Sequence, residues 1–325
     1  MSERMPPRIA LDFVLLNESL AEPGSYNKYI SQFTKMSWIQ EISELARENF
    51  SVRQLMNNRN LKKEITETFG ALCMVERSLR KFLPLLTDLP IISFEALIKT
   101  QKNLVFYDIC CGKGITSFLI TLLLPEARVV MIDSNSKINL QYLKCSRLNR
   151  TTFSCTDIYT SGFEDYLTSD AELESLRGNI PIIIGLHVCG LLSIRIIELF
   201  NKISRLPILV LSPCCMPRGK NGKKLSSKVR ANKWNHYRYW CLYVYTAIAT
   251  SICIPPATAT ALDSESLSAL LFSPSVIKDI VYDDEIVSEK NAVILAVKST
   301  RVSPFTFGTS HCGECMSSGV NNIIR

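Results

Sequence analysis

The sequence predicts an α/β fold built on a doubly wound, mostly parallel sheet, with a helical segment ahead of it. Between residues 101 and 300, short apolar runs alternate with stretches of helical periodicity, as in repeated βαβ units. The last two apolar runs, 277–282 and 292–297, are joined only by a short acidic turn. That connection predicts an antiparallel hairpin strand that closes the sheet.

The expected elements follow the chain in order. Residues 1–100 carry apolar side chains at helical spacing, which predicts an N-terminal helical cap that either packs on the main domain or recognises substrate. Residues 101–300 are expected to form the sheet domain, and residues 301–325 a flexible tail. Strands are expected at 104–109, 129–132, 152–155, 181–186, 208–211, 277–282 and 292–297, and helices at 115–124, 137–148, 192–204 and 237–252.

Composition indicates a globular protein of a reducing compartment. Of 325 residues, 47% are hydrophobic and 21% are charged, which excludes a disordered chain, and the net charge of +7 is compatible with an acidic partner such as RNA. The 12 cysteines include adjacent pairs, and no apolar leader follows the polar start, so we expect a cytoplasmic or nuclear protein. The uncharged stretch 241–262 is long enough for a membrane span. Its prolines and threonines favour a buried helix that runs into a loop, so no membrane partner is expected.

A glycine loop follows the first expected strand and opens a helix, which is the context of a nucleotide-binding loop. It reads Asp108-Ile-Cys110-Cys-Gly112-Lys-Gly114, and its glycines let the backbone approach a ligand closely. Taken alone, this loop fits two cofactors. Asp133, about 20 residues after Gly112, lies where a dinucleotide site also places an acid for the ribose.

Acidic residues at three strand ends favour S-adenosylmethionine over a dinucleotide. Asp108 precedes the loop, where it can serve an ammonium group, and Asp157 follows the third strand, where it can accept from an adenine amino group. The third glycine of the dinucleotide pattern is missing. With Asp133 closing the second strand, residues 101–300 resemble the Rossmann-like class I methyltransferases that use S-adenosylmethionine. This resemblance implies cofactor roles for Asp108, Cys110, Gly112, Gly114, Asp133, Asp157 and Ile158.

Two cysteine motifs point to a narrower group. Strand four ends in His187-Val-Cys189-Gly190 and strand five in Cys214-Cys215-Met-Pro. With the Gly-Lys-Gly loop they resemble the methyltransferase domain of glutathione-S-transferase C-terminal-domain-containing proteins and the tRNA 2′-O-methyltransferases of the acceptor stem, although Met216-Pro-Arg stands where the tRNA enzymes have histidines. The resemblance implies a hydroxyl acceptor on a tRNA-like RNA. A protein or small-molecule substrate, and a non-catalytic binding protein of this fold, remain the alternatives.

His187 is the candidate catalytic residue. A hydroxyl acceptor must lose its proton, and an imidazole at a strand end opposite Pro213 can take it; the competing interpretation is a structural hydrogen-bonding residue. Cys189 or Cys214 as a nucleophile toward a pyrimidine is a weaker alternative to packing thiols. The tail motif His311-Cys312-x-x-Cys315 is one zinc half-site without a second of suitable spacing, so no metal site is expected.

A basic segment follows the second cysteine motif. It combines cations with Trp234, His236, Tyr237, Tyr239 and Trp240 beside the expected functional edge of the sheet, a pattern that suits phosphate contacts and base stacking. A solvated loop ahead of an amphipathic helix explains it equally well. The cations that would contact RNA are Arg218, Lys220, Lys223, Lys224, Lys228 and Arg230.

Overall fold

The computed structural model describes residues 27–35, 38–82, 94–232, 235–249, 275–288 and 290–299. The first 26 residues of the expected cap, the tail 301–325 with its His311-Cys312 motif, and residues 250–262 of the uncharged stretch lie outside the described residues. Within the described ranges, no helix is both long enough and apolar enough to cross a membrane.

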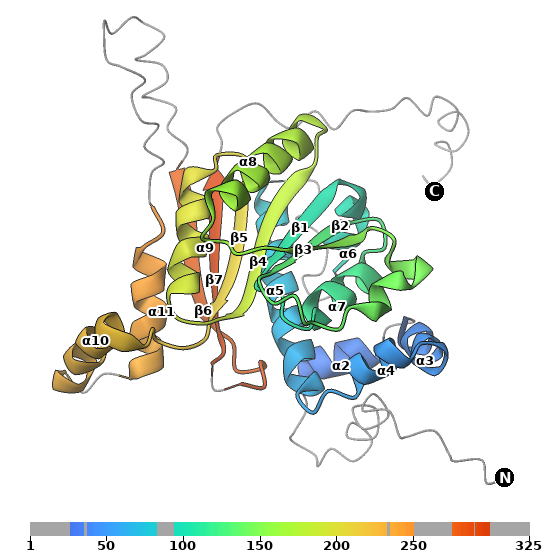
Figure 1. The fold of residues 1–325 in the computed structure, drawn as a ribbon, viewed down its shortest axis with the longest axis horizontal. Helices are drawn as coiled ribbons and strands as arrows, with labels where there is room; N and C mark the ends of the chain where they lie inside the picture. Colours follow the sequence, from blue (N-terminus) through green and yellow to red (C-terminus); the bar gives the residue numbers. More distant parts are fainter. Residues whose placement is uncertain are drawn as a thin grey trace, which may run out of the picture.

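The sheet has seven strands in the order β3-β2-β1-β4-β5-β7-β6 (Figure 1). Every neighbouring pair is parallel except those that involve β7, which runs antiparallel to both β5 and β6. The expected doubly wound sheet with a closing antiparallel hairpin strand is therefore confirmed. The strands are β1 Leu104–Ile109, β2 Arg128–Asp133, β3 Thr151–Cys155, β4 Ile180–Val188, β5 Ile208–Pro213, β6 Ser275–Tyr282 and β7 Ala292–Ser299.

Helices cover both faces of the sheet, which is why its central strands are continuous apolar runs. All six residues of β1 are buried, and alternate residues serve opposite faces: Phe106 packs in one core and Tyr107 in the other. One helical layer holds α5 (Leu61–Phe82) and α7 (Ile115–Leu123), and the other holds α8 (Ser161–Leu176), α9 (Leu191–Lys202) and α11 (His236–Thr246).

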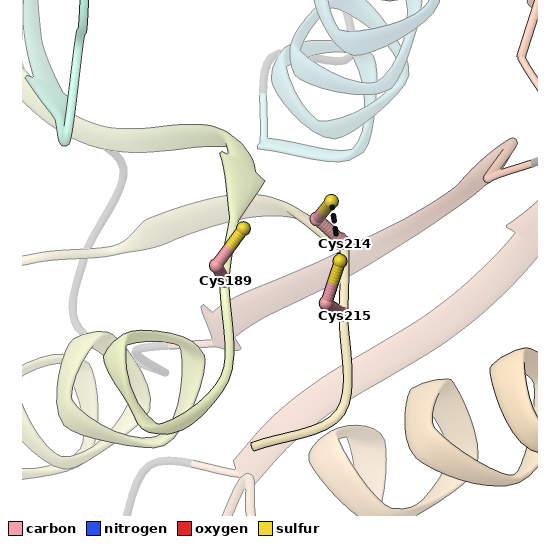
Figure 2. A group of neighbouring side chains, drawn as sticks. All are labelled: Cys189, Cys214 and Cys215. Atoms are coloured by element: carbon pink, nitrogen blue, oxygen red, sulfur yellow. Dashed lines mark hydrogen bonds between the residues drawn. The ribbon is translucent and has the colours of Figure 1, made fainter. Parts of the chain in front are cut away.

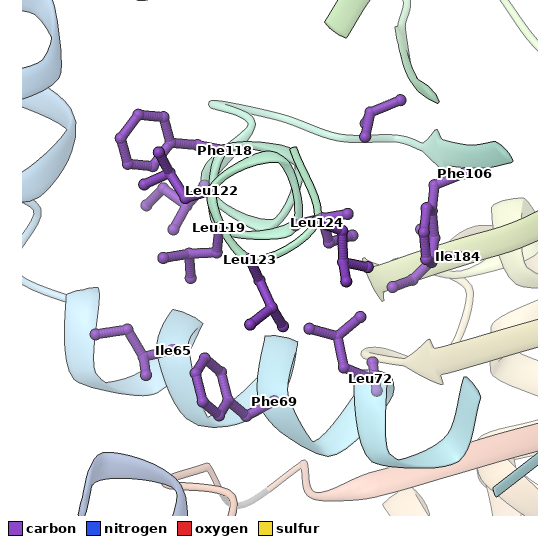
Figure 3. Packing of buried hydrophobic residues seen from close by; sticks show 14 of the residues in the cluster. Ile65, Phe69, Leu72, Phe106, Phe118, Leu119, Leu122, Leu123, Leu124 and Ile184 are labelled. Carbon is purple, nitrogen blue, oxygen red and sulfur yellow. The ribbon is translucent and has the colours of Figure 1, made fainter. Parts of the chain in front are cut away.

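The helical segment ahead of the sheet is also confirmed. It consists of α2 (Lys28–Lys35), α3 (Trp38–Glu48), α4 (Phe50–Met56), α5 and the short α6 (Glu95–Thr100). Figure 3 shows α5 beside α7, with Phe69 and Leu72 of α5 facing α7, and both helices pack on the same face of the sheet. Because α5 shares one core with the sheet, it can bring side chains directly to the sheet's edge.

One expected helix is absent. The helix expected over 137–148 is replaced by short 3₁₀ turns, Gln141–Lys144 and Ser146–Leu148. Asparagine side chains explain this: Asn135 Oδ1 accepts from the backbone N–H of Lys137 at 3.0 Å, and Asn139 Oδ1 accepts from that of Gln141 at 3.2 Å. Such local bonds compete with helical ones.

The sequence pattern also missed helices. No helix was expected between strands three and four, where α8 lies, and the basic segment forms α10 (Gly219–Ala231) rather than an open loop. In α8 only Phe163, Leu167, Ala171 and Glu174 are buried, so its apolar stripe is narrow and gives a weak periodic signal.

Candidate functional site

The loop after β1 is shaped by two glycines with positive φ. Gly112 has φ +54° and Gly114, the N-cap of α7, has φ +74°. A Cβ on Gly114 would lie 2.2 Å from both Met131 Cε and the Tyr142 hydroxyl, so this position requires glycine. A Cβ on Gly112 would meet no protein atom within 4 Å. The loop is therefore packed against the protein at Gly114 and open to a ligand at Gly112.

The acidic residues named from the sequence lie at adjacent strand ends. Asp133, at the end of β2, accepts from the backbone N–H of Gly112 at 3.0 Å and from that of Asn135 at 2.9 Å. Asp157 is exposed just beyond β3, and Ile158 next to it is 3% exposed. Cys110, also in the loop, has φ +62°, a strained value for a residue with a Cβ. The structure thus brings the expected cofactor residues to one edge.

Asp108 is a buried carboxyl group in an acidic environment. It is 2% exposed and accepts a hydrogen bond from the Ser117 hydroxyl at 2.5 Å. Burial raises the pKa of Asp108 to about 7; the Ser117 hydrogen bond opposes this rise, and the charges of Glu64 and Asp133 add to it. Burial likewise raises the pKa of Glu64 above its usual value.

This excess of acid discriminates between the two candidate cofactors. S-adenosylmethionine carries a sulfonium and an ammonium group, both positive, so it relieves the repulsion among Asp108, Glu64 and Asp133. The pyrophosphate of a dinucleotide would bring negative charge to the same loop and increase the repulsion. The residues present fit S-adenosylmethionine.

His187 lies on a β-bulge near the end of β4. The pairing of β4 with β5 shifts between Gly185 and Val188, so that Val188 pairs with Pro213. From the sequence, His187 had been expected opposite Pro213. His187 has φ +57°, which is uncommon outside glycine. Bulges of this kind change the direction of a side chain, and here the imidazole meets α5.

The partners of His187 come from α5 and were missed by the sequence analysis. The Glu67 carboxylate contacts Nε2 of His187, and the Lys63 ammonium lies 2.5 Å from the same nitrogen. Glu67 is 2% exposed, and its Oε1 is buried without a hydrogen-bond partner among the described residues. The only sequence signal was the i, i+4 spacing of Lys63 and Glu67 on an amphipathic helix, which is equally typical of a surface ion pair.

Electrostatics favours a charged imidazole in this arrangement. Burial lowers the pKa of His187, but hydrogen bonds with Cys214 and Glu67, together with the charge of Glu67, raise it overall to about 9. Glu67 needs a hydrogen on Nε2, whereas Lys63 needs a lone pair there. The cluster therefore has two alternative proton arrangements.

The two cysteine motifs meet beside His187. Cys189 on the loop after β4 faces Cys214 and Cys215 on the loop after β5 (Figure 2). The Lys290 ammonium lies 3.0 Å from the Cys215 sulfur, and hydrogen bonds from Lys290 and Cys214 lower the pKa of Cys215.

The basic segment lies on α10, whose first residues follow Cys215 closely. Arg218, Lys223, Lys228 and Arg230 are exposed, and within the described part of the chain none of them forms an ion pair. The side chains of Lys220 and Lys224 lie outside the described residues.

The neighbouring aromatic residues are largely structural. Trp240 is fully buried and stacks on Tyr243, and the Tyr237 hydroxyl accepts from the backbone N–H of Ala292 at 2.9 Å. Trp234 lies outside the described residues, whereas His236 is exposed. Of the expected stacking surface, Trp240 is therefore unavailable, because its ring is part of the core.

Comparison with known proteins finds a similarity to methyltransferases. Residues 80–218 match a family model described as a methyltransferase domain, a range that includes β1–β5 and both cysteine motifs. The comparison with curated proteins finds no match.

Several solved methyltransferases match most of this chain at low identity and low TM-score. The plantazolicin methyltransferase BpumL, solved with SAH, is 13% identical over 89% of this chain and 98% of its own, with a TM-score of 0.34. A putative methyltransferase from Thermobifida fusca YX is 14% identical over 92% and 99%, with a TM-score of 0.33. Human N-acetylserotonin methyltransferase, solved with SAM, is 10% identical over 84% and 70%, with a TM-score of 0.30. Because these TM-scores are low, residue roles rest on the contacts described above.

Proposed function

We propose that this protein is an S-adenosylmethionine-dependent methyltransferase that methylates a hydroxyl group of an RNA. The observation that supports the cofactor assignment is the acidic, open loop after β1. Asp108, Glu64 and Asp133 lie around this loop, and no protein atom occupies the space beside Gly112. The family match over residues 80–218 supports the reaction class.

Each residue at this edge has a distinct role in holding the cofactor. Asp108 and the loop residues Cys110, Gly112 and Gly114 hold the amino-acid portion, because a buried carboxylate pairs with an ammonium group. Asp133 accepts hydrogen bonds from the ribose hydroxyls. Asp157 and Ile158 hold the adenine ring, one through a hydrogen bond and the other through apolar contact. The bound cofactor supplies an electrophilic methyl group.

The cluster around His187 handles the acceptor's proton. With its pKa at about 9, His187 is mostly protonated at neutral pH, and the neutral form that can accept a proton grows as pH rises. In that neutral form, a hydrogen on Nε2 is donated to Glu67 and Nδ1 is the basic nitrogen. Glu67 then stabilises the imidazolium that forms when Nδ1 takes the hydroxyl proton. Lys63 lies 3.4 Å from the Glu67 carboxylate and moderates its charge. Much of the remaining rate comes from holding hydroxyl and methyl in line.

The RNA assignment is supported by the position of α10. Its exposed cations follow the loop that carries Cys214 and Cys215. A phosphate backbone bound there would therefore pass the edge of the sheet where His187 lies. A protein substrate or a small molecule is the alternative outcome of the test below.

Two measurements on the full chain test this function. Calorimetric titration should show binding of S-adenosylmethionine and its demethylated product, and none of a reduced dinucleotide; the reverse result would remove the cofactor assignment. Transfer of labelled methyl from the cofactor should then mark RNA from a cell extract, with a label that resists the mild alkali that cleaves methyl esters. Label in protein or in small molecules would replace the RNA substrate, and cofactor binding without any label would indicate a non-catalytic binding protein.

A further inference from the structure

Three cysteine sulfurs meet at the ends of β4 and β5. The Sγ atoms of Cys189, Cys214 and Cys215 all lie within 4.8 Å of one another, and those of Cys214 and Cys215 are 3.2 Å apart. Figure 2 shows them on two separate loops that face each other. Cys189 is exposed and the other two are half-buried, so an ion can reach the cluster from solvent.

Backbone hydrogen bonds hold the two loops together without any ion. The N–H of Gly190 donates to the Cys215 carbonyl at 2.8 Å, and the N–H of Cys214 donates to the Val188 carbonyl at 3.0 Å. A Cβ on Gly190 would lie 3.3 Å from Pro217 Cα, which shows how closely the loops approach. The three sulfurs are therefore placed by the fold, as a preorganised ligand set requires.

Charge at the cluster is balanced by one lysine. Three thiolates and a divalent ion carry a net charge of −1, and the Lys290 ammonium supplies the compensating positive charge. Its Nζ lies 3.0 Å from the Cys215 sulfur and 3.6 Å from the Cys214 sulfur. Hydrogen bonds of this kind to ligating sulfurs orient them and tune the ion that they hold.

We propose that Cys189, Cys214 and Cys215 bind a zinc ion through three sulfurs and leave its fourth position open. Tetrahedral zinc with bonds of about 2.3 Å places sulfurs about 3.8 Å apart, which small side-chain rotations achieve here. Thiolates prefer such thiophilic ions, and three protein ligands with one open position are the arrangement of reactive rather than structural zinc sites.

Sequence spacing alone did not predict this site. No metal site was expected, because the one Cys-x-x-Cys half-site in the sequence lacks a second of suitable spacing. Here the ligands come from two strands that are adjacent in the sheet, and Lys290 comes from the turn before β7. The inference does not depend on methyl transfer, since it concerns ion binding by residues outside the cofactor loop.

Metal titration of the full-length reduced protein tests the proposal. After chelation, Co²⁺ added without oxygen should bind at one ion per chain with a sulfur-to-cobalt charge-transfer band, and Zn²⁺ should abolish that band by displacement. Cys189→Ser, an exposed position that folding tolerates, should weaken Co²⁺ binding and reduce the band. Cys145→Ser, a half-buried thiol outside the cluster, serves as the matched control and should change neither.

A second variant keeps the test independent of ligand loss. Lys290→Met retains all three thiols and should lower the affinity for Co²⁺ about 10–100-fold, as loss of an outer-shell partner does. The proposal is overturned if no charge-transfer band appears, or if Cys189→Ser and Lys290→Met both bind cobalt as the parent does. A disulfide between any two of Cys189, Cys214 and Cys215 in protein purified without oxygen and without added reductant would also overturn it.

Discussion

The two halves of the sheet's functional edge are built differently. The cofactor half, at β1–β3, holds the residues proposed to contact the cofactor. These residues lie in short local segments, and the Gly112 N–H donates a hydrogen bond directly to Asp133 of the next strand. In the acceptor half, at β4–β5, the side chains that contact His187 and Cys215 come from distant parts of the sequence. Glu67 lies 120 residues from His187, and Lys290 lies 75 residues from Cys215. The cofactor half can thus be recognised as a motif, whereas the acceptor half exists only once α5 and β7 have packed.

Both halves share one feature, which is backbone strain at a strand end. Cys110 after β1 and His187 near the end of β4 have positive φ, although neither is glycine. Such conformations cost roughly 1–3 kcal/mol and persist where function requires them. The following predictions test whether the two halves have separate tasks, cofactor binding and proton transfer.

The largest effect is expected on the acceptor half. His187→Ala should lower methyl-transfer turnover by about 10²–10⁴-fold, because the hydroxyl proton loses its acceptor. Affinity for S-adenosylmethionine should stay within about twofold, a difference of less than 1 kcal/mol. Turnover and calorimetric affinity should be measured on one preparation. A stable variant that transfers methyl at the parental rate shows that His187 is not the base, and a loss of cofactor affinity assigns it to the cofactor half.

Asp108→Asn should have the opposite profile. The amide still accepts the Ser117 hydrogen bond but no longer pairs with an ammonium group, so S-adenosylmethionine affinity should fall by about 1.5–3 kcal/mol. The ligand-free variant should be more stable than the parent at neutral pH, because a buried carboxylate beside Glu64 and Asp133 is removed. Calorimetry checks the affinity for S-adenosylmethionine, and denaturant unfolding checks the stability of the ligand-free protein.

The same group makes stability depend on pH. The pKa of Asp108 is about 7 in the folded protein against an ordinary value of 3.8, so the folded state binds more protons between these values. The free energy of unfolding contributed by Asp108 should therefore fall as pH rises from about 4 to 7, by a few kcal/mol at most. Across this range, the free energy of unfolding of the parent should fall relative to that of Asp108→Asn as pH rises. A difference between the two proteins that stays constant with pH contradicts the assignment.

Gly112→Ala should weaken cofactor binding more than it weakens folding. Its added Cβ meets no protein atom, so the fold bears only the cost of positive φ, about 1–2 kcal/mol. Gly178→Ala is a matched control, because Gly178 has φ +80° and equally open surroundings in the turn between α8 and β4. Both variants should lose similar stability, but only Gly112→Ala should lose about tenfold or more in S-adenosylmethionine affinity. Equal affinities would place the ligand elsewhere.

The smallest effect per residue is expected on α10. Replacing Lys223, Lys228 and Arg230 with Gln should flatten the salt dependence of RNA affinity by about 0.7 in log–log slope for each lost phosphate contact. The control carries Lys99→Gln, Lys102→Gln and Arg205→Gln, the same change of charge near the opposite ends of β1 and β5. If both triple variants give the parental slope, α10 does not contact the phosphates.

Local chemistry made the cofactor half predictable. Glycine is favoured where the backbone takes positive φ, as at Gly114, and an acid at a strand end can be recognised from its neighbours in the sequence alone. The parallel doubly wound sheet and its closing hairpin strand followed from the alternation of apolar runs. The pattern failed where the local signal was ambiguous: the turns at 141–148 follow asparagines that bond their own backbone, and the stripe of α8 is narrow.

By itself, the sequence determined the α/β class, the glycine loop and the strand-end acids Asp108, Asp133 and Asp157, because these depend on neighbouring residues and on strand ends that parallel topology brings to one edge. Glu64 joins these acids only through the packing of α5. Only the tertiary structure decided what surrounds His187 and which thiols meet. Lys63 and Glu67 reach the imidazole because α5 packs on the sheet and a bulge turns His187 toward it. The register of that packing depends on the whole core, which no single segment of the sequence encodes.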